Sequence, residues 1–292
     1  MRLPGKGSVV WINGQVLSRS EATLPLSDPV VQAGLGLFET MGVRQGRVMD
    51  LPGHLSRLRQ AAVVMSVDLP ADEELVSALS PVVASLPPVS WVKILASRSG
   101  LLAAFGAGME PSDEGRPSSA ILLNWRLSHL GPIAGIKTLN YAPFILGTEQ
   151  ARAEGADEGI WLNTRGHVGE GCSSNLVVVQ KGKLYTASPG DGVLPGIVRD
   201  LALRAARELG LTVHEGKVRL KRLEQADEAF LTSSLRSVRP LIRFRARPVG
   251  NGEPGPITRR ISRKVQGMRT YTDPARWDTD SSGAVVAERP YV

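Results

Sequence analysis

The chain has 292 residues, 42% hydrophobic and 22% charged, which is ordinary for a soluble protein with one large domain or two smaller ones. Its net charge of +7 rests on 35 basic residues, 27 of them arginines, but these are scattered and aromatic residues are only 5%, so the composition does not indicate nucleic-acid binding. No apolar run is long enough for a membrane span, we read no export signal, and a single cysteine, Cys172, excludes an internal disulfide and fits a reducing cytoplasm.

The first part of the chain is predicted to form two hairpins, two helices and a buried strand. Asn13-Gly14 and Gln45-Gly46 are typical hairpin turns, and Pro52 is a suitable first residue for a helix. The expected elements are strands 8–12, 15–18, 37–44 and 47–51, helices 52–65 and 71–86, and strand 91–97. Residues 106–118, rich in Gly, Pro and Ser, are expected to be a linker.

Strands and helices continue to interleave after this linker. The expected elements are strand 120–125, helix 148–154, strands 159–163, 167–169, 176–180 and 184–186, helix 197–209, strands 212–218, 228–232 and 243–249, and helix 257–268. Because no regular βαβ rhythm appears, the pattern favours two α+β domains over a doubly wound sheet. Residues 270–292 lack periodicity and are predicted to be a mobile or partner-packed tail.

Two residues of opposite charge stand out as candidates for chemistry. Lys137 lies in an apolar, Gly-flanked segment, where partial desolvation would lower its pKa and free the amine. Glu170 follows 33 residues later between two glycines, which would allow a flat ligand to approach the backbone. Pyridoxal-phosphate chemistry needs this pair, because the amine forms a Schiff base and the carboxylate keeps the pyridine nitrogen protonated. Each residue alone also fits an ordinary surface position.

A phosphate group would need free amides at a helix start, hydroxyls and a cation. Gly196 and Ile197 open a predicted helix, whose free N–H groups and dipole attract anions. Ser233 and Ser234 follow a predicted strand, and Arg57 lies three residues after His54 on one helix face. Each feature also has a purely structural explanation. Gly196 and Ile197 could be an ordinary junction between a glycine and a helix, Ser233 and Ser234 a hydroxyl-rich turn, and Arg57 a partner in a surface salt bridge.

Other chemistries lack their usual patterns. The four histidines are dispersed, with no close His/Cys pairing for a metal ion. Neither a nucleophile elbow nor a Walker loop nor a dinucleotide-binding glycine motif is present. Cys172 has no evident histidine partner and is interpreted as a small packing residue.

Seven motifs, in one order along the chain, resemble the class IV aminotransferase family, whose members are the fold-type IV pyridoxal-phosphate enzymes. The motifs are WING (11–14), GLGLFETM (34–41), HLSRL (54–58), AGIKTLNY (134–141), GHVGEGCSSN (166–175), LPGIVRD (194–200) and FLTSSLRSVRPL (230–241). The resemblance implies a small N-terminal α/β sandwich domain (1–117), a larger C-terminal pseudo-barrel domain (118–269) and a tail (270–292). It also implies a homodimer with the active site between the domains.

The resemblance assigns roles to single residues. Lys137 would be the Schiff-base lysine and general base, Glu170 would hold the pyridinium proton, and Tyr141 would line the pocket. The expected cofactor ligands are Arg57, Lys137, Tyr141, Glu170, Ser173, Ser174, Asn175, Gly196, Ile197, Ser233 and Ser234. Thr40 and Arg98 are candidates for contacting the small amino substrate.

Within the family, the segments around AGIKTLN and ASRSG (96–100) look most similar to aminodeoxychorismate lyase, which forms 4-aminobenzoate and pyruvate in the folate pathway. The main expectation is therefore this lyase. The alternative is an aminotransferase acting on a branched-chain or D-amino acid with 2-oxoglutarate, since Tyr141 follows Asn140 as in several transaminases. A remote third possibility is a non-catalytic pyridoxal-phosphate-binding protein.

Overall fold

This computed structural model describes residues 9–110 and 115–277. The chain forms two compact units, of which the first contains residues 1–111, 136–140 and 270–292. The second contains residues 112–135 and 141–269. Most of the predicted tail, residues 278–292, lies outside the described residues, as do Ser8 and residues 111–114 of the predicted linker.

The first unit is built on a seven-stranded antiparallel sheet with the strand order β17-β4-β3-β5-β6-β1-β2. Its strands are β1 (Val10–Ile12), β2 (Gln15–Leu17), β3 (Gly36–Arg44), β4 (Arg47–Met49), β5 (Val89–Ser97), β6 (Leu102–Gly108) and β17 (Tyr271–Thr272). Its helices are α1 (Pro29–Ala33), α2 (Leu51–Met65), α3 (Asp72–Ala84) and the 3-10 turn η3 (Pro274–Arg276). The β5 strand lies at the centre of the sheet, paired with β3 and β6.

The core of this unit lies between the sheet and the helices α2 and α3. On β3, the alternating residues Leu37, Met41 and Val43 join Leu55 and Leu58 of α2 in one buried apolar cluster. Glu39 belongs to the same alternating row, so the strand period carries its carboxylate into this core.

The second unit contains a ten-stranded mixed sheet with the path β12-β11-β10-β14-β15-β7-β8-β9-β13, to which β16 adds by pairing with β15. Its strands are β7 (Ser118–Leu127), β8 (Glu158–Asn163), β9 (His167–Gly171), β10 (Asn175–Gln180), β11 (Lys183–Thr186), β12 (Val213–Glu215), β13 (Val218–Arg219), β14 (Glu228–Ser233), β15 (Ser237–Phe244) and β16 (Arg247–Pro248). The β15–β7 and β7–β8 pairs are parallel, whereas β10–β14 and β14–β15 are antiparallel.

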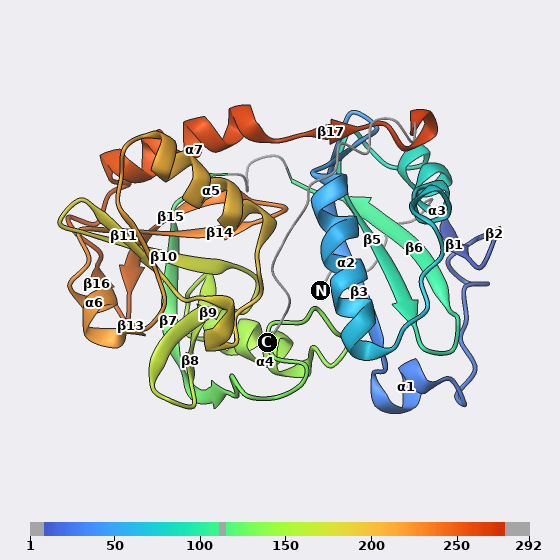
Figure 1. Ribbon diagram of the computed structural model, residues 1–292, viewed down its shortest axis with the longest axis horizontal. Coiled ribbons are helices and arrows are strands. Elements are labelled where there is room, and N and C mark those ends of the chain that lie inside the picture. Colours follow the sequence, from blue (N-terminus) through green and yellow to red (C-terminus); the bar gives the residue numbers. More distant parts are fainter. Residues whose placement is uncertain (1–8, 111–114, 278–292) are drawn as a thin grey trace. The chain divides into compact units, whose positions relative to one another are not determined.

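The helices of the second unit cover this sheet. They are α4 (Ala142–Ala153), α5 (Ile197–Glu208), α6 (Leu220–Glu224) and α7 (Pro256–Met268), with the 3-10 turn η2 at Pro189–Asp191. Figure 1 shows α5 and α7 side by side over strands of the sheet, and both bury apolar residues against Val177, Phe230 and Val238. No helix in the described ranges is both long and apolar enough to cross a membrane.

Most predicted elements are present within a few residues of their predicted bounds, but four predictions are wrong. The predicted linker 106–118 is too long, because β6 continues to Gly108 and β7 begins at Ser118. Gly106 belongs to the strand because its missing side chain leaves room for Trp91, whose carbonyl oxygen would lie 2.4 Å from an added Cβ.

The other three errors concern a divided strand, a helix start and a hairpin. The predicted strand 212–218 is two strands, β12 paired with β11 and β13 paired with β9. Helix α4 begins at Ala142, six residues before the predicted start at residue 148. The predicted strand 243–249 is instead a hairpin, because Arg245 and Ala246 adopt left-handed φ angles of 49° and 61° between β15 and β16. Strand β6, helix α1 and the first half of β15 were not predicted.

Candidate functional site

Glu170 is held at the end of β9 by neutral donors. Its side chain is 7% exposed, and Asn175 Nδ2 donates to its Oε2 at 2.9 Å. The backbone N–H of Leu194 lies 3.1 Å from both carboxylate oxygens. These contacts fix the orientation of the carboxylate.

Asn175 connects this carboxylate to the start of helix α5. Its Nδ2 also donates to the carbonyl oxygen of Leu194 at 2.8 Å, and its Oδ1 lies so close to Gly196 that a Cβ there would approach it to 1.9 Å. Gly196 is the N-cap of α5, and no side chain caps this end of the helix in the described residues. The amides of the first turn therefore form an electropositive end suited to a phosphate.

The buried hydroxyl of Thr232 belongs to the residue paired with Asn175, at the start of β10. Thr232 is the Cα partner of Asn175 in the β10–β14 pairing and is 1% exposed. Its Oγ1 has no hydrogen-bond partner among the described residues. A buried polar atom without a partner is costly, so a ligand oxygen at this position would remove a penalty. The uncapped helix start and this hydroxyl together fit the phosphate of the cofactor predicted above.

The two predicted phosphate-side serines after β14 differ in their contacts. Ser233 Oγ accepts a hydrogen bond from the backbone N–H of Arg236 at 3.3 Å. The carbonyl oxygen of Ser234 accepts from Arg269 Nη2 at 3.0 Å. These contacts hold the turn between β14 and β15, and the cofactor role of both serines stays a prediction.

Ser173 and Ser174 hold a turn. Their hydroxyls donate to the same oxygen, Oε2 of Glu158, at 2.9 and 2.8 Å. Burial raises the pKa of Glu158, although hydrogen bonds from Ser174, Ser173 and the Gly159 amide act in the opposite direction. Burial, with the charge of Glu158, also raises the pKa of Cys172 to about 12, which suits a packing residue and not a thiolate nucleophile.

Arg57 is paired in the core of the first unit. Its Nε and Nη2 donate to Oε1 and Oε2 of Glu39, each at 2.7 Å, and His54 Nδ1 lies 2.7 Å from Glu39 Oε2. The surface salt bridge considered for Arg57 is therefore wrong, since Glu39 and His54 are 1% exposed and Arg57 7%. Sequence reasoning missed Glu39, although its place in the alternating row of β3 predicts that it faces the core.

The protonation states of Glu39 and His54 depend on each other and on Arg57. Burial by itself would raise the pKa of Glu39, but Arg57 and His54 outweigh that effect and hold the pKa well below its ordinary value. Burial lowers the pKa of His54 more than Glu39 raises it, so the imidazole is neutral near pH 7. Because a carboxylate only accepts, Nδ1 carries the proton, and the buried Nε2 has no partner among the described residues.

Lys137 shares one aromatic ring with a second lysine. Its Nζ lies 4.3 Å from the centre of the Phe38 ring, and Lys93 Nζ lies 4.4 Å from the same centre. The segment around Lys137 is fixed on β3 because Phe38 N donates to the Lys137 carbonyl oxygen at 3.0 Å and Leu139 N donates to the carbonyl oxygen of Gly36 at 2.9 Å. The backbone that carries Lys137 is therefore anchored on β3, and the chemistry of its amine stays a prediction.

Lys93 is a candidate that sequence reasoning left undecided, because strand alternation could point it either way. It is 9% exposed, and burial lowers its pKa to about 8. Lys93 is the Cα partner of Thr40, so the predicted substrate residue Thr40 shares its face of the sheet.

The remaining predicted residues lie in different settings. Arg98 is exposed at the end of β5. The hydroxyl of Tyr141 donates to the carbonyl oxygen of Cys172 at 3.0 Å, and its ring stacks on Phe144 at 4.6 Å. Tyr141 thus supports the turn that carries Ser173 and Ser174, and its role at the cofactor stays a prediction. Lys137 belongs to the first unit and Glu170 to the second.

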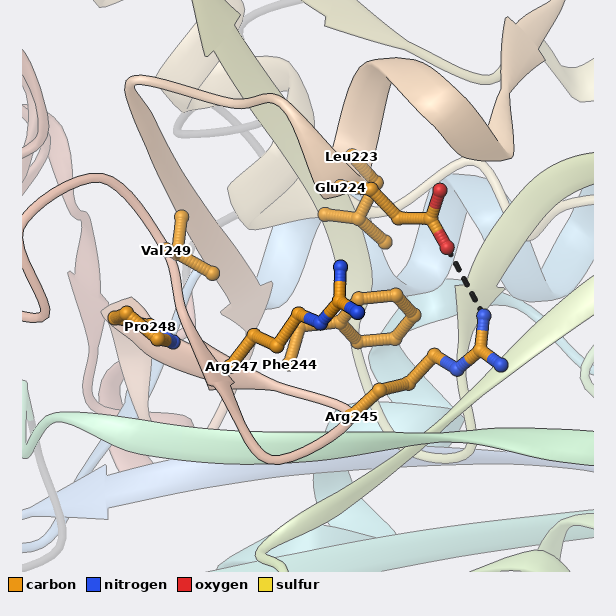
Figure 2. Close-up of a pocket in the computed structure, with 7 residues that line it drawn as sticks. All are labelled: Leu223, Glu224, Phe244, Arg245, Arg247, Pro248 and Val249. Carbon is orange, nitrogen blue, oxygen red and sulfur yellow. Dashed lines mark hydrogen bonds and ion pairs between the residues drawn. The ribbon is translucent and has the colours of Figure 1, made fainter.

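Figure 2 shows a pocket of about 370 Å³ on the β15–β16 hairpin of the second unit. It is lined by Leu223, Glu224, Phe244, Arg245, Arg247, Pro248 and Val249. None of these is a predicted site residue, and the ion pair between Arg245 and Glu224 at 2.9 Å closes one side. In the parts of the chain that the structure describes, no cluster of His, Cys, Asp and Glu could hold a metal ion.

Comparison with known proteins agrees with the motif order. The model of the amino-transferase class IV family matches residues 36–244. A putative branched-chain-amino-acid aminotransferase of Methanocaldococcus jannaschii is 27% identical over 283 residues, 89% of this chain and 96% of the relative. A D-alanine aminotransferase of Bacillus licheniformis is 28% identical over 277 residues, 88% of this chain and 95% of the relative.

A solved structure gives the same result. The branched-chain amino acid aminotransferase of Thermobaculum terrenum in its pyridoxal-phosphate form superposes with a TM-score of 0.79 at 26% identity, covering 90% of this chain and 94% of that one. The fold-type IV architecture, enzymatic character and pyridoxal-phosphate dependence predicted from the motifs are confirmed. The chain belongs to the class IV aminotransferase family.

Proposed function

We propose that this protein is a pyridoxal-phosphate-dependent aminotransferase that acts on a branched-chain or D-amino acid. The observation that carries this proposal is the near full-length similarity to relatives named as branched-chain and D-alanine aminotransferases. It favours the alternative named from the sequence over the lyase that was the main expectation. The predicted homodimer and cytoplasmic location are kept as parts of the proposal, and sedimentation of the full chain tests the first.

Different residues would bind the phosphate and the ring nitrogen of the cofactor. The N-terminus of α5, from Gly196 and Ile197, would hold the phosphate with the hydroxyls near Thr232 and with Arg57. Glu170, oriented by Asn175 and Leu194, would accept and keep the proton on the ring nitrogen. When bound, pyridoxal phosphate supplies an electron-accepting ring that stabilises negative charge on the amino-bearing carbon of the substrate.

Proton transfer is assigned to Lys137. A lysine accepts a proton only as the neutral amine. The Nζ of Lys137 lies 4.3 Å from the centre of the Phe38 ring, which fixes where the amine is placed. Lys93, close to the same ring and buried, would attract a carboxylate of the substrate to this side of the sheet. In this assignment Lys137 takes the proton from the substrate carbon, while Lys93 orients the substrate without reacting.

One assay distinguishes the two reactions. The purified protein is incubated with a branched-chain L-amino acid or D-alanine plus 2-oxoglutarate, and separately with aminodeoxychorismate without a keto acid. Acceptor-dependent formation of glutamate supports the proposal. Release of 4-aminobenzoate without an acceptor, together with no glutamate formation, would establish the lyase instead.

A pair of lysine variants tests the cofactor assignment. Lys137→Ala is expected to fold, to lose the yellow colour that borohydride bleaches, and to lose activity by about 10³-fold or more. Lys183→Ala, at an exposed hairpin position, is the matched control and should keep both colour and activity. A yellow Lys137→Ala protein that still reduces onto its own chain would overturn the assignment.

A further inference from the structure

Glu158 is a buried carboxylate to which the proposed function gives no task. We propose that Glu158 is a positioning residue for Glu170, and that it acts by fixing the turn between β9 and β10. The turn is fixed because Glu158 accepts hydrogen bonds from Ser173 and Ser174, and it sets Asn175 against Glu170. This inference rests on the proposed function, in which Glu170 keeps the proton on the ring nitrogen of the cofactor.

The hydroxyls of Ser173 and Ser174 already have an acceptor. Each serine has one O–H group to donate, and both donate to Oε2 of Glu158, at 2.9 and 2.8 Å. The phosphate oxygens of the cofactor are also acceptors, so a direct contact would need the same two protons. Removing these protons would leave a carboxylate that is 1% exposed without its donors, which is costly for a buried group. The hydroxyls therefore serve the turn better than they serve a ligand.

Backbone hydrogen bonds attach the same turn to the start of β8. Gly171 N donates to the carbonyl oxygen of Ser174 at 2.7 Å, which closes the turn on itself. Cys172 N donates to the carbonyl oxygen of Gly159 at 3.0 Å. Gly159 N donates to Oε1 of its neighbour Glu158 at 3.2 Å. One oxygen of Glu158 is therefore held by the backbone of β8, and the other holds the turn.

The two ends of the turn adjoin the hydrogen-bonded pair of Glu170 and Asn175. Gly171 directly follows Glu170 in the sequence. Ser174 directly precedes Asn175, whose Nδ2 donates to Glu170 Oε2 at 2.9 Å. Packing at these ends is close, since a Cβ on Gly171 would lie 2.5 Å from Ser174 Oγ and 3.0 Å from Cδ of Glu158. A change at Glu158 therefore reaches both members of the pair through one residue of backbone.

Glu158 acts in this role as an acceptor and not through its charge. Glu158→Gln keeps a side-chain oxygen that can accept both hydroxyls, whereas Glu158→Leu has a similar size and accepts neither. A double variant, Ser173→Ala with Ser174→Ala, removes the donors and leaves Glu158 in place. Together, these variants separate the hydrogen bonds from the volume of the buried side chain.

The test compares two ligands that differ only at the ring nitrogen. The full-length protein is stripped of cofactor and titrated calorimetrically with pyridoxal phosphate and with 1-deazapyridoxal phosphate, in which a C–H group replaces the nitrogen. The nitrogen preference is the dissociation constant of the second ligand divided by that of the first. Loss of packing alone weakens both ligands and leaves this preference unchanged, whereas a displaced Glu170 lowers it.

The variants are expected to fall into two groups. Glu170→Ala removes the group that would face the nitrogen and should lower the preference about ten-fold or more, because a charge-assisted hydrogen bond is lost. Glu158→Leu and the double serine variant should lower it about five-fold, because hydrogen bonds weaken when their partners are displaced. Glu158→Gln retains the acceptor and should keep the preference within about two-fold of the wild type.

Thr258→Val is the matched control. It removes a hydroxyl that donates at 2.7 Å to another buried carboxylate of the second unit, Glu228, and it should keep the preference within about two-fold. Far-UV circular dichroism checks the folding of each variant. If Glu158→Leu fails to fold, the double serine variant decides the matter, because it retains the buried carboxylate.

The outcomes separate this inference from the function beneath it. An unchanged preference in the folded Glu158→Leu or double serine variant, with a lowered preference in Glu170→Ala, would overturn only the positioning role, even if both ligands bind more weakly. A preference that falls as far in Glu158→Gln as in Glu158→Leu would overturn the acceptor role. An unchanged preference in Glu170→Ala would remove Glu170 from the ring nitrogen, and the positioning role would be wrong together with that part of the proposed function.

Discussion

The two units support their predicted site residues with different chemistry. In the first unit, the buried carboxylate Glu39 is paired with the cation Arg57 and with His54. In the second unit, the buried carboxylate of Glu158 accepts hydrogen bonds from the hydroxyls of Ser173 and Ser174. Glu170 nearby in the sequence accepts one from the side-chain amide of Asn175.

The same burial therefore has opposite outcomes at the two carboxylates. The pKa of Glu39 is lowered because the charges and hydrogen bonds of Arg57 and His54 outweigh desolvation. The pKa of Glu158 is raised because desolvation outweighs its hydrogen bonds and the more weakly acting charge of Arg239. At these two acids, the sum of the partners' charges and hydrogen bonds decides whether the cost of burial is overcome. The first unit thus keeps a buried ion pair, and the second keeps a buried acid whose pKa lies above its ordinary value.

The largest effect is expected from removing the paired carboxylate. Glu39→Ala leaves the charge of Arg57 in the core without the acid that neutralises it, which should lower the free energy of unfolding by about 3–5 kcal/mol. Urea unfolding at pH 7 measures the change. A loss below about 1 kcal/mol would mean that this cluster is no more important to the fold than a surface pair.

A substitution at Gly196 should disturb the hydrogen bond between Asn175 and Glu170 in the second unit. Gly196→Ala places a Cβ against Asn175 Oδ1, so the start of α5 or the Asn175–Glu170 bond must shift, at a cost of about 1–3 kcal/mol. Cofactor affinity should fall with it. Gly267→Ala in α7, where nothing lies within 4 Å, is the control and should be neutral or slightly stabilising by thermal unfolding.

The pH dependence of stability should have opposite signs for the two acids. Glu39 has a lowered pKa, so its contribution is present above its ordinary value of 4.5 and is lost as the pH falls below it. Glu158 has a raised pKa, so the folded state binds the extra proton, and stability falls as the pH rises from 4.5 to that raised value.

Glu158→Gln sharpens this contrast. Relative to the wild type, the variant should gain stability as the pH rises above 4.5, by up to about 1.4 kcal/mol per pH unit, and the gain should level off once Glu158 is ionised in the folded wild type. Urea unfolding at half-unit intervals from pH 4.5 to 8 measures it. Parallel pH profiles for the two proteins would contradict the assignment.

The smallest effect is expected at the exposed ion pair between Arg59 of α2 and Asp72 of α3. The side chains of Arg59 and Asp72 are 39% and 36% exposed, so Asp72→Asn should change the free energy of unfolding by less than about 1 kcal/mol. The measurement matters because the pair resembles Arg57–Glu39 in chemistry and differs in burial. A loss of stability as large as that of Glu39→Ala would contradict the idea that burial makes the Arg57–Glu39 pair more important to stability.

Local signals in the sequence identified the elements and the order of the site motifs. Helices α2 and α5 follow from apolar spacing, and the Asn13-Gly14 and Gln45-Gly46 turns follow from the residues that tolerate positive φ, 44° at Asn13 and 50° at Gln45. Lys137 and Glu170 were singled out by their local sequence, and the order of seven short motifs then assigned their predicted roles. Strand β6 was missed because LAAFGAG has weak strand propensity, and its central neighbours, not its own residues, hold it in the sheet.

The partners of the site residues were decided by tertiary structure. Arg57 and Glu39 are 18 positions apart, and Ser174 and Glu158 are 16 apart, so no local pattern pairs them. Strand alternation indicates that Glu39 faces inward, but only the packing of α2 on β3 brings a cation to it. The sequence alone determined the family and predicted which residues carry the chemistry, because residue types and their order can be read without the fold. The fold determined which of them are charged and how they are oriented, because burial and long-range contacts set both.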